Sequence, residues 1–231
     1  MNRSAPTARG AAAGWRIAHV VMPAGWSVRV HDADLVPKTG PVILAPNHSG
    51  FIDAPLLMGA SPRPLHCLTK KEMFWGPMGW FLAAVGQIPI DRSGPDRRAL
   101  MRSAAVLDEG RVLVVYPEGR RGAGDFADVR PGLAWFALRS GAPVVPVVSL
   151  GTGARGTSWM AVPAVRARLD VVFGAPIEVP AGGRSRAALS SASEKLRDAL
   201  TTHHASVRRR FRTGPGAGAD DGQDAQTEER A

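Results

Sequence analysis

A histidine and an aspartate lie five positions apart in the segment that runs from Asn47 to Asp53. In one regular helix two such residues point about 140° apart, because each residue turns by about 100°. A direct contact between His48 and Asp53 therefore needs a non-helical stretch, which Gly50 permits. A carboxylate held this way fixes the imidazole tautomer and leaves the other nitrogen to take a proton from an alcohol. The spacing by itself favours a capping or solvated pair, so the prediction of a general base depends on the other motifs.

Arginines end two further motifs. Residues 86–92 form an apolar run that leads to Arg92, and residues 116–122 continue an apolar run into a glycine-flanked turn with Arg120 and Arg121. A guanidinium matches phosphate in a bidentate fork, and glycine lets the backbone approach a ligand closely. Taken singly, each arginine is typical of a solvated surface charge. Together they predict a phosphate clamp.

Alternating apolar patterns predict the elements that must position these motifs. Short apolar runs predict strands at residues 41–46, 65–69, 87–90, 112–116, 143–150 and 169–173, and helical spacing predicts helices at residues 51–58, 71–85, 95–109, 131–140 and 184–202. Helices and strands therefore alternate, which is typical of an α/β domain with a mixed, largely parallel sheet covered by helices. Each motif follows a predicted strand, where open α/β sheets gather their ligands.

The chain of 231 residues, 45% hydrophobic and 21% charged, has the size and composition of one globular domain. We expect residues 1–30 to be a flexible N-terminus with a short amphipathic helix suited to a membrane surface. Residues 31–212 are expected to form the α/β domain. Residues 213–231 lack apolar periodicity and are expected to be a disordered tail.

A formal charge of +9 predicts attraction to polyanions. Nucleic acid is not the expected partner, because the motifs that usually accompany basic residues in nucleic-acid modules are missing.

The single Cys67 excludes an internal disulfide and is expected to be a small buried hydrophobe. No metal site is expected, and the pair His203 and His204 is read as solvated.

No segment is expected to span a membrane. The longest uncharged run, residues 73–90, is interrupted by glycines and prolines. Its aromatic residues Phe74, Trp75, Trp80 and Phe81 fit either the core or a lipid interface, and burial in the core is the expected outcome.

The motifs together resemble the glycerolipid acyltransferase family, and specifically its bacterial 1-acylglycerol-3-phosphate acyltransferases. The resemblance covers residues 41–148. Its first block, with His48 and Asp53, matches the family's His-x4-Asp signature, which implies that His48 is the general base and Asp53 its orienting carboxylate. One departure is Gly50, where many members have serine.

The other blocks occur in family order. Arg92 closes the second block and is implied to hold the acceptor's phosphate. Glu118 and Gly119 belong to the third block, and the resemblance implies that both bind the substrate. The phosphate-binding arginine of this block corresponds to Arg121, whereas Arg120 stands in place of the usual threonine and has no assigned role. Residues 145–147 resemble the fourth block. Residues 69–72 resemble a lysine-bearing segment, which makes Lys70 a lesser phosphate candidate.

The resemblance implies an enzyme without a cofactor that moves a fatty acyl group from acyl-CoA or acyl carrier protein to lysophosphatidic acid, giving phosphatidic acid. It implies a peripheral protein on the cytoplasmic face of the cell membrane. Three alternatives stay open: a relative acting on glycerol 3-phosphate or a lysophospholipid, an acyl thioesterase, and a non-catalytic lipid-binding protein.

Overall fold

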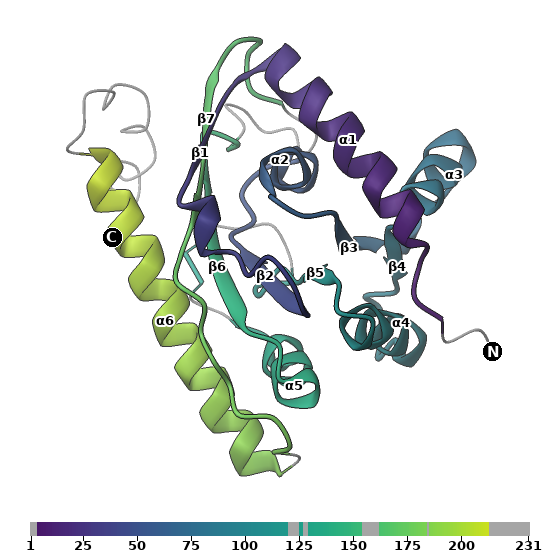
Figure 1. Ribbon diagram of the computed structural model, residues 1–231, viewed down its shortest axis with the longest axis vertical. Coiled ribbons are helices and arrows are strands. Elements are labelled where there is room, and N and C mark those ends of the chain that lie inside the picture. Colours follow the sequence, from purple (N-terminus) through teal and green to yellow (C-terminus); the bar gives the residue numbers. More distant parts are fainter. Residues whose placement is uncertain (1–3, 120–124, 127–128, 154–161, 184, 213–231) are drawn as a thin grey trace, which may run out of the picture.

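The computed structural model describes residues 4–119, 125–126, 129–153, 162–183 and 185–212. In this part of the chain, seven strands form one sheet in the order β1-β7-β6-β2-β5-β3-β4 (Figure 1). Every neighbouring pair is parallel except β6 and β7, which confirms the expected mixed, largely parallel sheet. The strands are β1 (Ser27–His31), β2 (Val42–Pro46), β3 (Leu65–Lys70), β4 (Ile88–Ile90), β5 (Val112–Val114), β6 (Val144–Leu150) and β7 (Arg168–Phe173).

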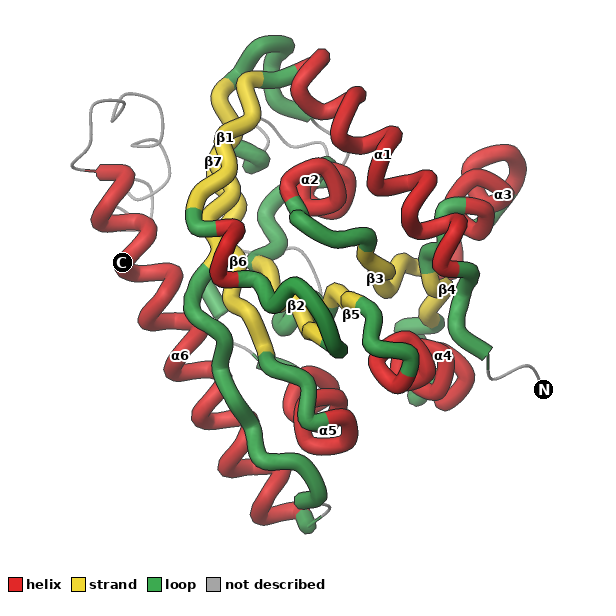
Figure 2. Tube along the Cα trace, viewed as in Figure 1, coloured by secondary structure: helices red, strands yellow, loops and turns green. Residues whose placement is uncertain are grey.

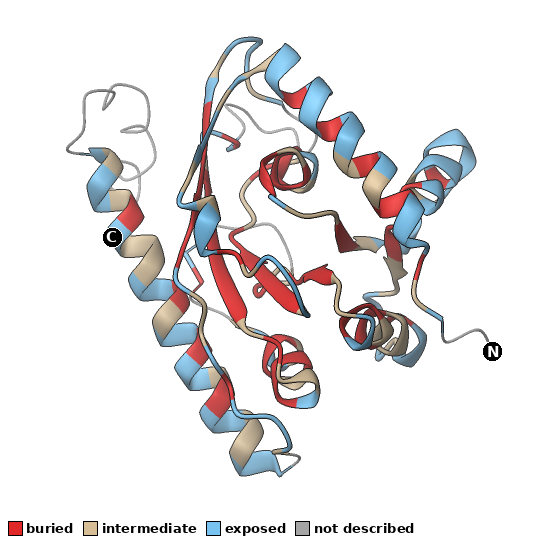
Figure 3. Cartoon of the chain, viewed as in Figure 1, coloured by how far each residue is buried: buried red, intermediate tan, exposed pale blue. Residues whose placement is uncertain are grey.

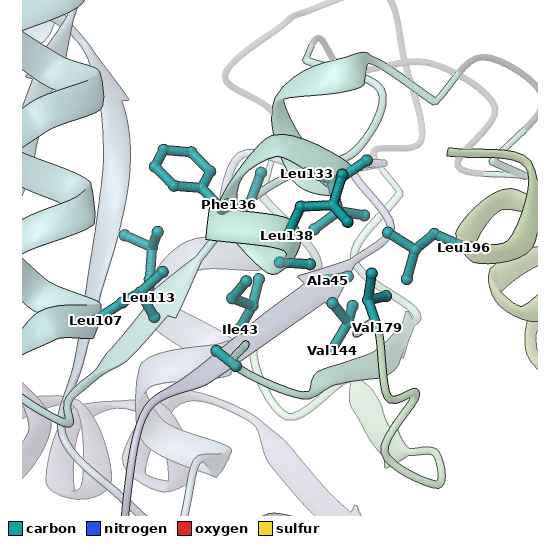
Figure 4. Close-up of a cluster of buried hydrophobic side chains, with 14 of the residues drawn as sticks. Ile43, Ala45, Leu107, Leu113, Leu133, Phe136, Leu138, Val144, Val179 and Leu196 are labelled. Carbon is teal, nitrogen blue, oxygen red and sulfur yellow. The ribbon is translucent and has the colours of Figure 1, made fainter. Parts of the chain in front are cut away.

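Helices cover both faces of the sheet (Figure 2). One apolar core joins the sheet to α4 (Arg97–Asp108), α5 (Pro131–Ser140) and α6 (Arg186–Arg212). Figure 4 shows this core, in which Phe136 of α5 and Leu196 of α6 lie around Ile43 of β2. A second core joins the other face to α1 (Ala8–Gly25) and α2 (Asp53–Ala60).

The N-terminal helix α1 packs closely on its neighbours because small residues line its inner face. A Cβ atom added at Gly10 would lie 2.3 Å from the carbonyl oxygen of Ala84, and one at Gly14 would lie 2.8 Å from the side chain of Val85. The indole Nε1 of Trp15 also donates a hydrogen bond to the carbonyl oxygen of Ser61, at 2.8 Å. The expected N-terminal helix is therefore present, and it is part of the packed fold.

Most predicted elements are present, with shifted ends. The helix expected from residue 51 begins at Asp53, and the helix expected at residues 71–85 is a 3-10 turn, η2 (Lys71–Met73), followed by α3 (Gly76–Ala84). The sequence reading missed β1, which pairs with β7 and so brings residues before position 31 into the sheet. The expected tail at residues 213–231 lies outside the described residues.

The aromatic residues of the α3 region are the clearest correction. Trp75 is 84% exposed, Trp80 77% and Phe81 41%, and only Phe74 is half-buried. Figure 3 shows α3 mostly exposed. The expectation of core residues was wrong because α3 meets α1 near its C-terminal Ala84, while its buried Gly79 packs on the backbone of the preceding Phe74. The aromatic side chains of α3 are therefore left uncovered. Among the described residues, no helix is both long and apolar enough to cross a bilayer.

Candidate active site

The candidate site begins where β2 ends. Asn47 is buried, and its side chain brackets Ser149 of β6: Asn47 Oδ1 accepts a hydrogen bond from the Ser149 N–H at 2.8 Å, and Asn47 Nδ2 donates to the Ser149 carbonyl oxygen at 3.2 Å. These two bonds fix the direction in which the chain leaves the sheet. The sequence reading did not assign this role to Asn47.

His48 and Asp53 form the expected pair. The chain is not helical between them, and Nδ1 of His48 lies 2.9 Å from Oδ2 of Asp53. Because a carboxylate only accepts, Nδ1 carries the proton and Nε2 presents its lone pair. Nε2 has no hydrogen-bond partner among the described residues. The His48 side chain is 15% exposed, so this nitrogen is placed in a largely enclosed position.

The local backbone holds one oxygen of the Asp53 carboxylate in place. Its Oδ2 also accepts hydrogen bonds from the N–H groups of Ser49 and Gly50, each at 2.8 Å. Asp53 is the first residue of α2, where the helix dipole favours negative charge. Its side chain is 1% exposed. A buried anion with three donors is well placed to stabilise an imidazolium on His48.

The loop is closed on its other side by Thr152, just after β6. A Cβ atom added at Gly50 would lie 2.1 Å from the Thr152 carbonyl oxygen, so residue 50 must be glycine in this backbone. Ser49 Oγ lies 3.1 Å from Thr152 Oγ1 and bonds to it. The loop is thus tied to β6 through Ser49. The sequence reading gave no role to Thr152, which is fully buried.

Tyr116, just after β5, lies against His48. The two ring centroids are 4.2 Å apart and the ring planes are tilted by 33°. β5 is a direct neighbour of β2 in the sheet, which explains why residues so distant in sequence meet. The sequence reading placed Tyr116 within a buried strand, whereas it is half-buried beyond the strand end.

Glu118 and Gly119 form the expected tight turn. The Gly119 N–H donates to the Tyr116 carbonyl oxygen at 3.1 Å, and Gly119 has a φ of 66°, a left-handed conformation that favours glycine. Glu118 is buried, and its Oε1 accepts a hydrogen bond from the Phe126 N–H at 3.1 Å. In this structure Glu118 thus binds the backbone of Phe126, and its predicted contact with substrate stays a prediction.

The structure describes two of the three predicted phosphate-binding cations. Lys70 is exposed at the end of β3 and Arg92 is exposed just after β4. β2, β5, β3 and β4 are parallel neighbours, so both residues lie at the same edge of the sheet as His48. Arg121, and with it Arg120, lies outside the described residues.

Among the described residues, no group of three or more His, Cys, Asp or Glu side chains is placed to hold a metal ion. Burial raises the pKa of the Cys67 thiol to about 12, so this residue remains protonated and unreactive. His203 and His204, expected to be solvated, are half-buried on α6, and burial lowers the pKa of both.

This arrangement can be compared with known proteins. The model of the Acyltransferase family matches residues 27–150, which is more than half of the chain and contains β1 to β6 with the whole His48 loop. The chain belongs to this family. The resemblance drawn from the four sequence blocks is therefore confirmed.

Relatives of this acyltransferase-family chain share one description. It is 28% identical over 134 residues to a 1-acyl-sn-glycerol-3-phosphate acyltransferase of Bacillus subtilis (strain 168), a match that covers 57% of this chain and 67% of the relative. It is 27% identical over 164 residues to the 1-acyl-sn-glycerol-3-phosphate acyltransferase of Streptococcus pneumoniae, a match that covers 67% of this chain and 58% of the relative. It is 33% identical over 111 residues to the enzyme of the same description from Limnanthes alba, a match that covers 46% of this chain and 40% of the relative. The matches thus span between two fifths and two thirds of these relatives.

The fold of this acyltransferase-family chain also has a solved counterpart. The crystal structure of the 1-acyl-sn-glycerophosphate (LPA) acyltransferase PlsC from Thermotoga maritima matches with a TM-score of 0.61 and 22% identity, over 87% of this chain and 78% of that chain. At this level of identity the likeness establishes the fold.

Proposed function

We propose that this protein transfers a fatty acyl group from an acyl thioester to the free hydroxyl of 1-acyl-sn-glycerol 3-phosphate, giving phosphatidic acid. The observation that carries the proposal is the His48–Asp53 pair at 2.9 Å, with Nε2 of His48 left as a base, in a chain of the Acyltransferase family. The shared description of the relatives supports the choice of acceptor.

In the proposed reaction His48 Nε2 takes the proton of the acceptor hydroxyl as its oxygen attacks the thioester carbonyl carbon. A C–O bond forms, the C–S bond breaks, and the thiolate takes the proton from the imidazolium to leave as a thiol. Asp53 stabilises the positive charge on His48 during this step. A general base of this kind contributes about 10²–10⁴-fold in rate.

The reaction needs no acyl-enzyme. Ser49 is the hydroxyl nearest to His48 in sequence, but its Oγ is engaged with Thr152 Oγ1, and the Gly-x-Ser-x-Gly turn of serine hydrolases is not present around it. Both facts favour a structural role for Ser49. Direct transfer to the acceptor is therefore the simpler mechanism, with acyl-CoA or acyl carrier protein as donor.

The acceptor's phosphate is assigned to Arg92 and Arg121, with Lys70 as a lesser contact and the Glu118–Gly119 turn as the support of the loop. Arg92 and Lys70 come from strands that end on the same sheet edge as β2, and this supports the assignment. A planar guanidinium binds two phosphate oxygens at once, which suits a phosphomonoester.

We further propose that the protein rests on the cytoplasmic face of the cell membrane, with α3 at the lipid interface. Trp75, Met78, Trp80 and Phe81 are exposed. Large amphipathic rings are favoured at such an interface. Exposed cations lie on the adjoining elements: Arg9 and Arg16 on α1, Lys70 on β3 and Lys71 on η2. Each cation near an anionic membrane surface contributes about 1 kcal/mol.

The test is to incubate the purified protein with acyl-CoA and lysophosphatidic acid in mixed vesicles and to measure phosphatidic acid, free fatty acid and free thiol. We expect phosphatidic acid and thiol in equal amounts from the wild type and none from His48→Ala. Arg92→Ala and Arg121→Ala should raise KM for lysophosphatidic acid. Free fatty acid in place of phosphatidic acid would identify a thioesterase, and equal product from His48→Ala would exclude the base.

A further inference from the structure

A second group of charged side chains lies beyond the site described above. A hollow beside the end of β4 is lined by Lys71, Asp91 and Asp96, and by Arg98 and Arg102 of α4. Asp91 precedes Arg92 in the second sequence block, but none of these five residues is assigned to acceptor binding.

The two carboxylates of the hollow are already engaged. Asp91 pairs with Lys71 and accepts hydrogen bonds from the N–H and Oγ of Ser93. Asp96 caps α4: its Oδ1 accepts from the Ala99 N–H at 2.9 Å, and its Oδ2 accepts from the Asp91 N–H at 3.0 Å. The negative charges therefore serve the local backbone and Lys71.

The two guanidinium groups have no such partner. Arg98 and Arg102 are four residues apart on α4, so they lie on one face of the helix. Within the described part of the chain, neither side chain makes an ion pair or a hydrogen bond. Burial lowers the pKa of Arg102, and the charge of Arg98 lowers it further. Like charges at this spacing destabilise a helix, and an anion between them would reverse the effect.

We propose that Arg98 and Arg102 bind a phosphate group, and that in the proposed acyl transfer this is a phosphate of the donor's coenzyme A. Phosphate is common to two substrates, since lysophosphatidic acid also carries one. The location favours the donor. Arg98 and Arg102 lie within the first two turns of α4, after the loop that holds Arg92. The helix α4 covers the face of the sheet opposite to α2, whose first residue is Asp53.

The chemistry of the two substrates matches this position differently. In lysophosphatidic acid the phosphate and the reacting hydroxyl belong to one glycerol unit, so the phosphate must stay close to His48. Coenzyme A carries its phosphates at the far end of a long pantetheine arm from its thioester. Arg92 lies at the sheet edge that carries His48 and is assigned to the acceptor's phosphate, whereas Arg98 and Arg102 lie on a helix that covers the face of the sheet opposite to α2. This second position suits the distant phosphates of coenzyme A.

The assignment rests on the proposed function, and it is tested by steady-state kinetics with acyl-CoA and lysophosphatidic acid varied separately. We expect Arg98→Gln and Arg102→Gln each to raise KM for acyl-CoA about tenfold, with kcat and KM for lysophosphatidic acid within about twofold. The matched control is Arg97→Gln, an exposed arginine of α4 that does not line the hollow, and it should leave both KM values unchanged.

Two further arms identify the phosphate and separate this inference from the proposed function. A donor made from dephospho-coenzyme A should lose affinity for the wild type, and should lose nothing more for Arg102→Gln if the 3′-phosphate is bound. Calorimetric binding of coenzyme A needs no turnover, so weakened binding by Arg102→Gln would support the site even if no acyl transfer occurred. An increase in KM for lysophosphatidic acid alone would reassign the site to the acceptor. Unchanged KM values and unchanged coenzyme A binding would overturn the inference.

Discussion

The ring of Tyr116 lies against the imidazole of His48, with centroids 4.2 Å apart and a tilt of 33° between the planes. Asp53 holds the same imidazole in its plane through Nδ1. The two contacts restrict different motions, because the hydrogen bond fixes rotation within the plane and the ring contact fixes the plane itself. Tyr116 is therefore a positioning residue for the proposed base.

Replacing the ring tests this role. We expect Tyr116→Phe, which keeps the ring, to retain kcat within about threefold, and Tyr116→Ala to lower kcat by about tenfold or more, since a barrier change of about 1.4 kcal/mol is a factor of ten. KM for lysophosphatidic acid should change little in either variant. A loss in Tyr116→Phe as large as that in Tyr116→Ala would show that the hydroxyl, and not the ring contact, is what matters.

The charge of Asp53 can be removed with little change in shape. In Asp53→Asn the amide oxygen can take the place of Oδ2, but the imidazolium of His48 then faces a neutral group. We expect kcat to fall by about 10²–10⁴-fold, with cooperative unfolding retained. Circular dichroism and kcat together check this outcome.

The chain offers a matched control in a second pair of a histidine and an aspartate. His31 of β1 and Asp170 of β7 are 2.8 Å apart, and β1 lies at the opposite edge strand of the sheet from β4. Asp170→Asn should lower stability and leave kcat of the folded enzyme unchanged. A similar loss of kcat in both variants would mean that Asp53 acts through the fold and not through His48.

Most helices and strands, and the pairing of His48 with Asp53, could be predicted from the sequence because their signals are local. The proline-bounded run before Asn47 predicted β2, and the five-residue spacing with Gly50 predicted a non-helical loop, both of which the structure confirms. β1 was missed because all its residues are half-buried or exposed, and so its composition is not that of a core strand.

The contacts around the pair depend on sheet order, which no local pattern carries. Tyr116 meets His48 because β5 lies next to β2, and Thr152 meets Gly50 because β6 lies on the other side of β2. The aromatic side chains of α3 were misplaced for a related reason. Apolar composition does not distinguish a buried helix from one whose apolar side is left uncovered.

Gly50 is the departure from the family signature that the sequence shows, and the structure predicts that a serine at this position is harmful. The Cβ of Gly50→Ser would lie 2.1 Å from the Thr152 carbonyl oxygen, so the loop or the end of β6 must move. We expect a loss of about 1–3 kcal/mol in the free energy of unfolding and a fall in kcat, because Gly50 also donates to Asp53. Gly132→Ser, with nothing within 4 Å of its Cβ, is the control and should behave as wild type in urea unfolding and in kcat.

The exposed aromatic residues of α3 predict that a variant without them binds membranes more weakly. Trp75→Ser with Trp80→Ser should weaken binding to vesicles of anionic phospholipid by at least about tenfold in a flotation assay, since burying each ring contributes about 1.5 kcal/mol or more. Stability should not fall, because neither ring is in the core. Leu35→Ser, which removes an exposed apolar side chain on η1 (Ala33–Leu35), is the control and should bind as wild type. Unchanged binding in the double variant would place the membrane contact elsewhere.

His66 predicts an acid sensitivity of the fold that is separate from catalysis. It is fully buried on β3, where its Nδ1 donates to the Gly86 carbonyl oxygen at 2.7 Å and its Nε2 accepts from Arg111 NH1 at 2.8 Å. The pKa of His66 is lowered from 6.5 to about 4, chiefly by burial. The hydrogen bond to Gly86 and the charge of Glu109 oppose this shift, and the charges of Arg111 and Arg102 add to it. The native state therefore holds His66 neutral.

The unfolded chain binds a proton at His66 between pH 6.5 and 4 that the native state does not bind. Stability from this residue is thus complete above pH 6.5 and is lost as the pH falls toward 4, by about 2 kcal/mol at pH 5. Urea unfolding at pH 7.5 and 5.0 measures it. His66→Gln should be less stable at pH 7.5 but should lose about 2 kcal/mol less than wild type between the two pH values, whereas the exposed His19→Gln should lose as much as wild type. An equal loss in His66→Gln and wild type would show that the proton is taken up elsewhere in the chain.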